Sequence, residues 1–115
     1  MPEAIPDWDE LSDDEQRLFK RQAEVFAAYI SFTDHQIGRV IEAVKQTGQM
    51  DNTLIFLIYG DNGTSGVGGR NGMFSEMTYF NGVQETVPQM LEHIDEWGSA
   101  ATYPHMAAGW AVAFD

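Results

Sequence analysis

The hydrophobic positions of this chain follow two patterns with different periods. From residue 13 to about residue 47, apolar side chains recur every three or four positions between charged ones, which predicts an amphipathic α-helix of about 35 residues. Ser12 and Glu15 form a capping-box pair at its start, and Gly48 suits a C-cap at its end. The polar and β-branched residues 31–33 are where so long a helix could bend. The expected packed face is Leu18, Phe19, Ala23, Phe26, Ile30, Ile37, Val40, Ile41 and Val44.

The second pattern is an uninterrupted apolar run over residues 53–59, which Gly60, Asp61, Asn62 and Gly63 follow. A run without polar alternation predicts a strand buried on both faces, as in the parallel sheet of an α/β protein. Asp61 and Asn62 come just after its carboxyl end, where ligands bind in open α/β sheets. The chain offers at best one further, weak strand. Because buried backbone groups need hydrogen-bond partners, we expect residues 1–115 to be a segment of a larger domain.

The rest of the chain predicts a loop and a second helix. Residues 60–72 contain six glycines, which permits either close backbone approach to a ligand or simple flexibility. Thr86 and Gln89 form another capping box, and Gly98 ends the element, so a helix is expected over residues 87–97. Its expected packed stripe is Met90, Leu91, Ile94 and Trp97. Residues 107–114, which are small and apolar, suit a short strand or a close-packed loop.

Composition excludes several classes of function. The formal net charge is -12 with only six Lys and Arg residues, which argues against nucleic-acid binding. The chain has no cysteine, and therefore no disulfide, thiolate metal site or cysteine nucleophile. Its longest apolar run is too short to span a bilayer. We expect no signal peptide, because the first residues are acidic instead of basic and then apolar. Localisation stays open.

Asp61 and Asn62 are the strongest candidates for chemistry. An aspartate oxygen and an amide carbonyl oxygen are ligand types that Ca²⁺ and Mg²⁺ prefer. Two ligands are fewer than the six to eight oxygens that Ca²⁺ takes. Asp-Asn-Gly is also a common turn sequence. The residues themselves therefore leave a metal site and an ordinary turn open.

Other polar residues are weaker candidates for a functional site. His105 follows Pro104 in a loop of small residues, where it lines a pocket or packs within the loop. Arg70, in the glycine-rich stretch, is able to hold an oxyanion through two parallel hydrogen bonds, although single charged residues in such loops are usually solvated. Surface or turn roles are expected for His35, His93, Thr64 and Ser65.

Three motifs in sequence order give the chain a family resemblance. The stretch that begins at Asp34 (Asp-His-Gln-Ile-Gly-Arg-Val-Ile) lies towards the end of the long helix, Asp51-Asn-Thr-Leu-Ile-Phe begins the strand, and Gly60-Asp-Asn-Gly ends it. Together they resemble the middle of an arylsulfatase of the alkaline phosphatase superfamily. Residues 81–115 are similar to the continuation of one bacterial branch. The fold so implied is part of an α/β sandwich, with a long helix, a buried parallel strand, a glycine-rich loop and a second helix.

The resemblance implies hydrolysis of sulfate esters by a formylglycine hydrate beside a divalent ion. This ion is usually Ca²⁺, and Mg²⁺ is the alternative. Asp61 and Asn62 match the Asp-Asn pair that supplies part of the metal shell in such enzymes. Formylglycine arises in a Cys/Ser-x-Pro-x-Arg motif, but the residues two before a proline here are Ala4, Thr86 and Thr102. We therefore expect the nucleophile upstream, the rest of the sulfatase domain as partner, and no turnover by this chain alone.

Two alternatives remain open from the sequence. Relatives in the same superfamily hydrolyse phosphate esters or phosphonates instead of sulfate esters. In a different class of function, the chain would be a non-catalytic acidic module whose long helix docks on a partner. For either class, we expect the isolated chain to be unstable or self-associating, because an unpaired hydrophobic strand invites edge pairing.

Overall fold

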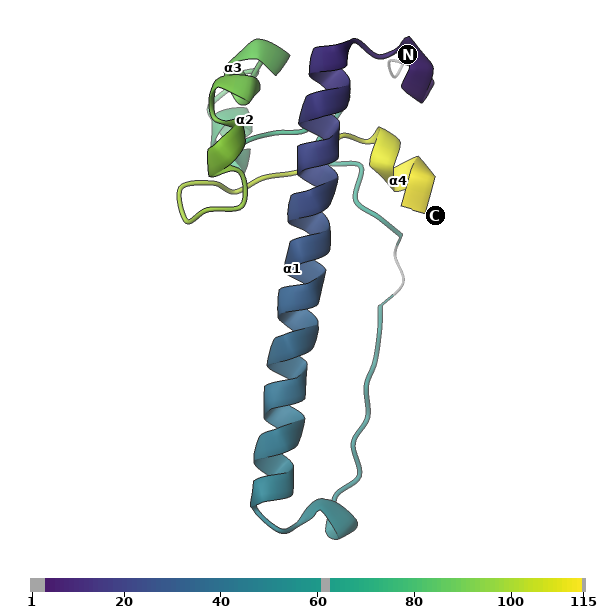
Figure 1. Ribbon diagram of the computed structural model, residues 1–115, viewed down its shortest axis with the longest axis vertical. Helices are drawn as coiled ribbons and strands as arrows, with labels where there is room; N and C mark the ends of the chain where they lie inside the picture. Colours follow the sequence, from purple (N-terminus) through teal and green to yellow (C-terminus); the bar gives the residue numbers. More distant parts are fainter. Residues whose placement is uncertain (1–3, 61–62, 115) are drawn as a thin grey trace. The chain divides into compact units, whose positions relative to one another are not determined.

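The computed structural model describes residues 4–60 and 63–114, and this part of the chain is mostly helical (Figure 1). It divides into two units, one of Met1–Phe26 with Gly63–Asp115 and one of Ala27–Asn62. None of the described helices is long and apolar enough to cross a membrane. The α-helices are α1 (Asp13–Gln46), α2 (Glu76–Phe80), α3 (Val87–Glu92) and α4 (Gly109–Phe114), and short 3-10 helices cover Trp8–Glu10, Met50–Asn52 and Ile94–Glu96.

Helix α1 confirms the longest predicted element. The Glu15 backbone N–H donates to Ser12 Oγ over 3.3 Å, and the Ser12 N–H donates to Glu15 Oε2 over 2.8 Å, which is the reciprocal pattern of a capping box. The helix continues through residues 31–33 without a break. There Thr33 Oγ1 donates to the Tyr29 carbonyl over 2.9 Å, so its hydroxyl is satisfied inside the helix. After the helix, Gly48 has φ 70°, as expected of a glycine C-cap.

The hydrophobic core lies in the first unit. Leu18 and Phe19 of α1 pack there with Met90 of α3, Trp97 and Ala107. Leu18 is completely buried, and the buried indole of Trp97 donates to the Met90 carbonyl over 3.3 Å. The predicted inward faces of both helices are therefore confirmed at these positions.

The second predicted helix exists, but it is shorter than expected. The Thr86 and Gln89 capping box is present at its start, and α3 ends at Glu92. A 3-10 turn, Ile94–Glu96, follows after His93, and Gly98 ends the element with φ 85°. Residues 109–114, expected as a strand or a loop, instead form α4, whose Trp110 indole donates to the Phe19 carbonyl over 3.0 Å.

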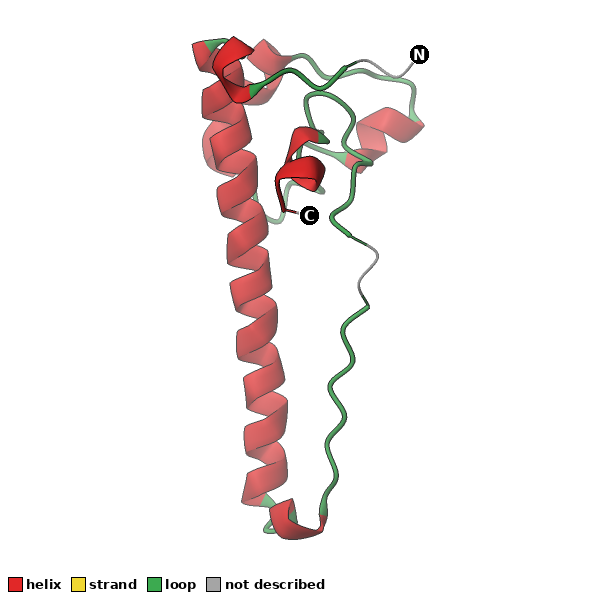
Figure 2. Ribbon diagram, turned by 90° about the vertical axis from the view of Figure 1, so that its right-hand side faces the viewer, coloured by secondary structure: helices red, strands yellow, loops and turns green. Residues whose placement is uncertain are grey.

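The predicted α/β fold with a buried parallel strand is wrong. No strand is present in residues 4–60 and 63–114 (Figure 2), and residues 53–60 have no regular secondary structure. Leu54, Phe56 and Ile58 of this run are 78%, 78% and 86% exposed. An apolar run becomes a buried strand only when other strands pair with its backbone, and the described residues supply no such sheet. The run showed which residues favour a strand, but not what they pair with.

In the second unit, the apolar stripe of α1 continues without a core. Ile30 and Val40 are 52% and 67% exposed, and Ile37, Ile41 and Val44 are only partly buried. The period of the pattern therefore predicted the helix correctly. It did not predict how completely each part of the stripe is covered.

Gly72 gives a first prediction for the stability of the first unit. It has φ +77°, and a Cβ there would collide with Gln22 Nε2 and lie 2.6 Å from the His105 carbonyl oxygen. Gly69 has φ +62° but open space around it, so it is a matched control. Urea unfolding should show a loss of about 1 kcal/mol for Gly69→Ala from backbone strain alone. For Gly72→Ala it should show about 3 kcal/mol, because overpacking adds to the strain. Equal losses would contradict the packing described here.

Candidate functional site

Asp61 and Asn62, the predicted metal ligands, lie outside the described residues, so their role stays a prediction. The described chain resumes at Gly63 with the glycine loop, defined here as residues 63–72. This loop packs against residues 103–108, which we call the His105 segment. Within residues 4–60 and 63–114, no three His, Asp or Glu side chains come together as a metal site would require.

Gln22 of α1 joins the glycine loop to the His105 segment. Its side chain is 2% exposed, although it is polar. Its Nε2 donates to the Asn71 carbonyl over 2.7 Å, and its Oε1 accepts from the Ala107 N–H over 2.9 Å. One amide thus satisfies backbone groups from two segments that are far apart in sequence. We did not predict this role, and the only signal for it is a polar residue three positions after Phe19 on the apolar face of the helix.

The glycine loop is tightly packed. A Cβ at Gly68 would collide with the Met106 carbonyl oxygen, and Ala108 N–H donates to the Gly69 carbonyl over 2.7 Å. Glycine there permits close approach of the loop to the backbone of the His105 segment. Ser65 Oγ accepts from the Val67 N–H over 3.3 Å, which confirms the predicted turn role of Ser65.

His105 is held in place through its backbone. Its N–H donates to the Met73 carbonyl over 2.9 Å, and its carbonyl accepts from the Met73 N–H over 2.8 Å. Its ring lies 5.9 Å from that of Tyr103, and Nε2 is 3.7 Å from Glu76 Oε1. That Nε2 is buried and makes no hydrogen bond within the described part of the chain, as is also true of Asn71 Oδ1. Substrate binding by His105 is not tested by this geometry and stays a prediction.

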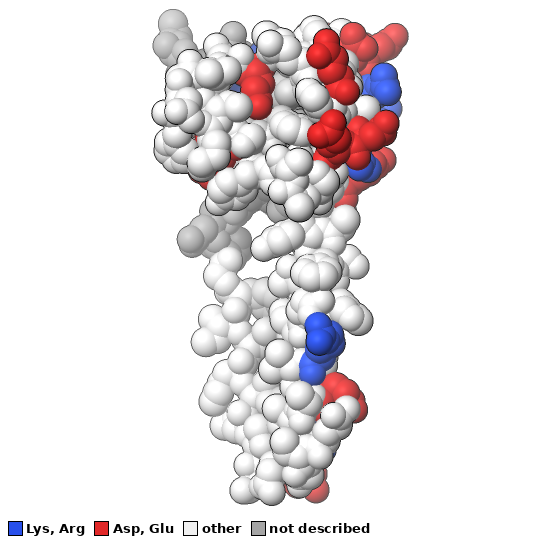
Figure 3. Space-filling view, turned by 90° about the vertical axis from the view of Figure 1, so that its left-hand side faces the viewer, with Lys and Arg blue, Asp and Glu red and all other residues white. Residues whose placement is uncertain are grey.

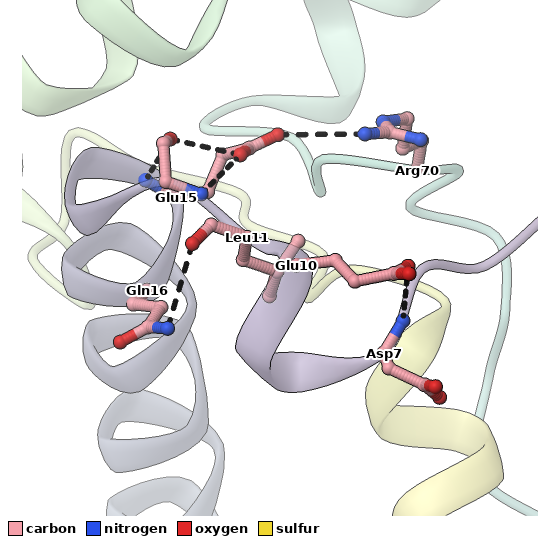
Figure 4. A network of polar contacts seen from close by, with 7 residues as sticks. Asp7, Glu10, Leu11, Glu15, Gln16 and Arg70 are labelled. Atoms are coloured by element: carbon pink, nitrogen blue, oxygen red, sulfur yellow. Dashed lines mark hydrogen bonds and ion pairs between the residues drawn. The ribbon is translucent and has the colours of Figure 1, made fainter.

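The guanidinium of the exposed Arg70 side chain faces Glu15 (Figure 4). Its Nη2 is 3.6 Å from Glu15 Oε1, so the guanidinium already has an anionic partner. Hydrogen bonds from the Ser12 backbone and hydroxyl, and then the charge of Arg70, hold the pKa of Glu15 below its ordinary value. The geometry therefore assigns Arg70 an ion pair that ties the glycine loop to the start of α1.

The other two histidines differ from each other. His35 is exposed on α1, as expected of a surface residue. His93 is also exposed, but its Nδ1 lies 2.9 Å from Glu96 Oε1 and its ring lies 5.4 Å from that of Phe74. The hydrogen bond to Glu96 raises the pKa of His93.

An apolar cleft of about 720 Å³ opens beside the glycine loop within the first unit. Trp8 and Trp110 line it with ring centroids 5.7 Å apart, and Asp7 and Arg70 are the charged side chains on its walls. Its volume falls in the range of small-molecule sites. No local pattern in the sequence signals this cleft, because its walls come from the N-terminal residues, Phe19 of α1, the glycine loop and residues 107–113.

Comparisons with known proteins point to one family. The sulfatase family model matches residues 2–101. A sulfatase of Schizosaccharomyces pombe, described as uncharacterized, is 42% identical over 59 residues, which are 51% of this chain and 10% of that protein. An arylsulfatase of Klebsiella aerogenes is 29% identical over 105 residues, which are 91% of this chain and 21% of that protein. The chain thus spans about a tenth to a fifth of the length of these relatives. No solved structure gives a significant match.

Replacing Gln22 should destabilise the packing of the glycine loop. Gln22→Met keeps a similar volume but leaves the Asn71 carbonyl and the buried Ala107 N–H without their partner. Each unsatisfied buried group costs about 1–3 kcal/mol, so we expect a loss of about 2–4 kcal/mol in urea unfolding. Gln46→Met, at the exposed end of the same helix, should stay within about 0.5 kcal/mol of wild type. Similar losses of stability for the two variants would contradict the role assigned to the Gln22 hydrogen bonds.

Glu15 should make stability depend on acid pH. Its folded pKa lies below the ordinary value of 4.5, so its ionised form stabilises the fold above that pH, and the contribution is lost as pH falls through the folded pKa. Glu15→Gln should therefore be less stable than wild type by about 0.5–1 kcal/mol at neutral pH. The difference should shrink towards zero in unfolding experiments at pH 3. Glu24→Gln, which removes an exposed ion pair with Arg21, should show a smaller difference at neutral pH.

Proposed function

Because this chain belongs to the sulfatase family, we propose that it is the metal-bearing central segment of an enzyme that hydrolyses sulfate esters. The observation that carries this proposal is the family match over residues 2–101, which contains Asp61 and Asn62. The relative from Klebsiella aerogenes is named an arylsulfatase, which favours aryl sulfates as the substrate class.

The proposed enzyme is larger than this chain. Its relatives are several times longer, and the chain contains no Cys/Ser-x-Pro-x-Arg motif from which formylglycine would form. We therefore assign residues 1–115 to one part of the catalytic domain and the nucleophile to another. The rest of that domain is the partner of this segment, and the 115 residues alone should not turn over substrate.

Asp61 and Asn62 would hold part of a divalent-cation site. A carboxylate and an amide carbonyl form a hard oxygen donor set, which fits Ca²⁺ and also Mg²⁺. The bound ion would supply Lewis-acid polarisation of the sulfate oxygens and neutralise developing charge. Asp61 would contribute the negative charge that makes cation binding favourable, and Asn62 a neutral ligand. The glycine loop starts at the next residue, and its contacts with Gln22 and Ala108 restrain the chain beyond the pair.

His105 is the proposed contact with the substrate. Its buried Nε2 has no hydrogen-bond partner within the described residues, and a ligand oxygen would satisfy it. Glu76 Oε1 lies 3.7 Å from the same nitrogen and is the nearest acidic group to it in the contacts of the described residues. Arg70 is a weaker candidate, because Glu15 already neutralises it.

The decisive experiment is Asp61→Ala in the longer protein that carries this segment. We expect bound Ca²⁺ to fall, and kcat/KM for an aryl sulfate to fall at least about 100-fold, because transition-state charge loses its stabilisation. Asp51→Asn, which changes an exposed aspartate of the Met50–Asn52 turn, is the matched control and should keep both metal and activity. Normal metal content and full activity in Asp61→Ala would overturn the assignment.

The same assay separates the substrate classes. Wild type should hydrolyse 4-nitrophenyl sulfate faster than 4-nitrophenyl phosphate. The opposite order would favour the phosphate-ester hydrolases of the same superfamily. No hydrolysis of either ester and no bound Ca²⁺ in the longer protein, together with loss of partner binding in variants of the helix face, would favour the non-catalytic acidic module.

A further inference from the structure

The His105 segment is held at two points along its backbone. His105 itself exchanges two backbone hydrogen bonds with Met73. Two residues later, the Ala107 N–H donates to Gln22 Oε1 over 2.9 Å. Ala107 is 2% exposed, so water does not compete for this N–H. The position of the His105 ring is therefore set between a backbone contact at residue 105 and a side-chain contact at residue 107.

Gln22 and His105 are also neighbours on two sides of Gly72. A Cβ built on Gly72 would collide with Gln22 Nε2 and would lie 2.6 Å from the His105 carbonyl oxygen. Gln22 Nε2 in turn donates to the Asn71 carbonyl over 2.7 Å. The buried amide thus lies beside the backbone of His105, with no side chain of Gly72 between them. Because protein interiors are close-packed, a change at the amide displaces that backbone.

The charge of this chain does not attract an anionic ligand at long range. Its formal net charge is -12. On the face shown in Figure 3, the acidic side chains gather around the start of α1, whereas most of the remaining surface is uncharged. A sulfate ester is repelled by such a field, so its binding to this chain depends on single polar atoms held within hydrogen-bond distance. His105 Nε2, which is buried and has no hydrogen-bond partner in the described residues, is the atom that the proposed function assigns to this contact.

We propose that Gln22 is a positioning residue for substrate binding and that it acts through His105. Its bond to Ala107 fixes where the His105 segment places Nε2. Its bond to Asn71 fixes that segment relative to the glycine loop. The positioning role rests on the proposed function, because it takes His105 as the contact with the sulfate ester. A misplacement of about 1 Å is enough to weaken such a contact strongly.

Glu85 is the competing candidate for the positioning role. Its Oε2 accepts from the Phe74 N–H over 2.7 Å, and the Phe74 carbonyl accepts from the Tyr103 N–H over 3.3 Å. Glu85 thus acts on the His105 segment through residues 73–76, and it is only partly buried. Gln22 bonds to the segment directly and is 2% exposed, so water cannot replace its bonds. For these two reasons we assign the positioning role to Gln22.

The test is a double-mutant cycle of Gln22→Met and His105→Ala in the longer protein that carries this segment. Each single variant should raise KM for 4-nitrophenyl sulfate by about 10-fold or more, because a hydrogen bond to a charged ligand is weakened or lost. The kcat should stay nearly unchanged, since the bound substrate and the transition state lose the same contact. In the double variant, Gln22→Met should add nothing to the effect of His105→Ala. Additive effects, or an unchanged KM in Gln22→Met, would overturn the positioning role.

Two further variants separate positioning from a general loss of stability. Gln22→Glu keeps an oxygen that accepts from the Ala107 N–H in either protonation state, so its KM should stay near that of wild type. A KM raised as far as that of His105→Ala would overturn the role of Gln22 even where Gln22→Met does not fold. Gly98→Ala has φ +85° and would place its Cβ 3.1 Å from Val25 Cγ1, so it should unfold at a lower urea concentration but keep its KM. An equal rise of KM in Gly98→Ala would mean that instability alone causes the effect.

Bound Ca²⁺ distinguishes the positioning role from the proposed function on which it rests. The metal content should be retained in Gln22→Met and in His105→Ala, whereas Asp61→Ala should lose it. Wild-type kinetics in His105→Ala would overturn the substrate contact of the proposed function, and with it the positioning role. Loss of Ca²⁺ in Gln22→Met would overturn only the action of Gln22 through His105.

Discussion

The packing of the first unit depends on the two hydrogen bonds of the Gln22 side chain. They join α1 to Asn71 at the end of the glycine loop and to Ala107 after His105. Because the amide is buried, water cannot replace either bond. Gly72 has no side chain to obstruct this arrangement, and α1 contributes Leu18 and Phe19 to the adjacent core. A polar group in an apolar core thus joins α1 to two segments that backbone hydrogen bonds, such as the one from Ala108 N–H to the Gly69 carbonyl, also join to each other.

Polar side chains that looked like candidates for chemistry mostly stabilise this arrangement. Arg70 pairs with Glu15 at the start of α1, and Ser65 supports a turn within the glycine loop. His105 differs, because its backbone is fully paired while its Nε2 is buried without a hydrogen bond in the described residues. Charged groups are therefore weak guides to function in a loop of this kind. A buried polar atom that lacks a partner is a stronger one, since such atoms are rare.

The two units differ in how far their apolar residues are buried. In the first unit, α1, α3 and Trp97 cover one another, and Leu18 is completely excluded from solvent. In the second unit, the stripe of α1 and the apolar segment, residues 54–59, remain largely exposed. The sulfatase family model matches residues 2–101, and the chain spans about a tenth to a fifth of the length of the relatives described above.

The sequence by itself determined α1 with both of its ends and the start of α3, because a helix satisfies its backbone within a few residues and its caps are local. For that reason the sequence alone predicted the two capping boxes, Ser12 with Glu15 and Thr86 with Gln89. The family was likewise carried by motifs in sequence order. Only the tertiary structure decided that residues 53–60 form no buried strand and that Gln22 is buried. Strand pairing and the burial of a side chain depend on partners distant in sequence, and no local pattern specifies which partners are present.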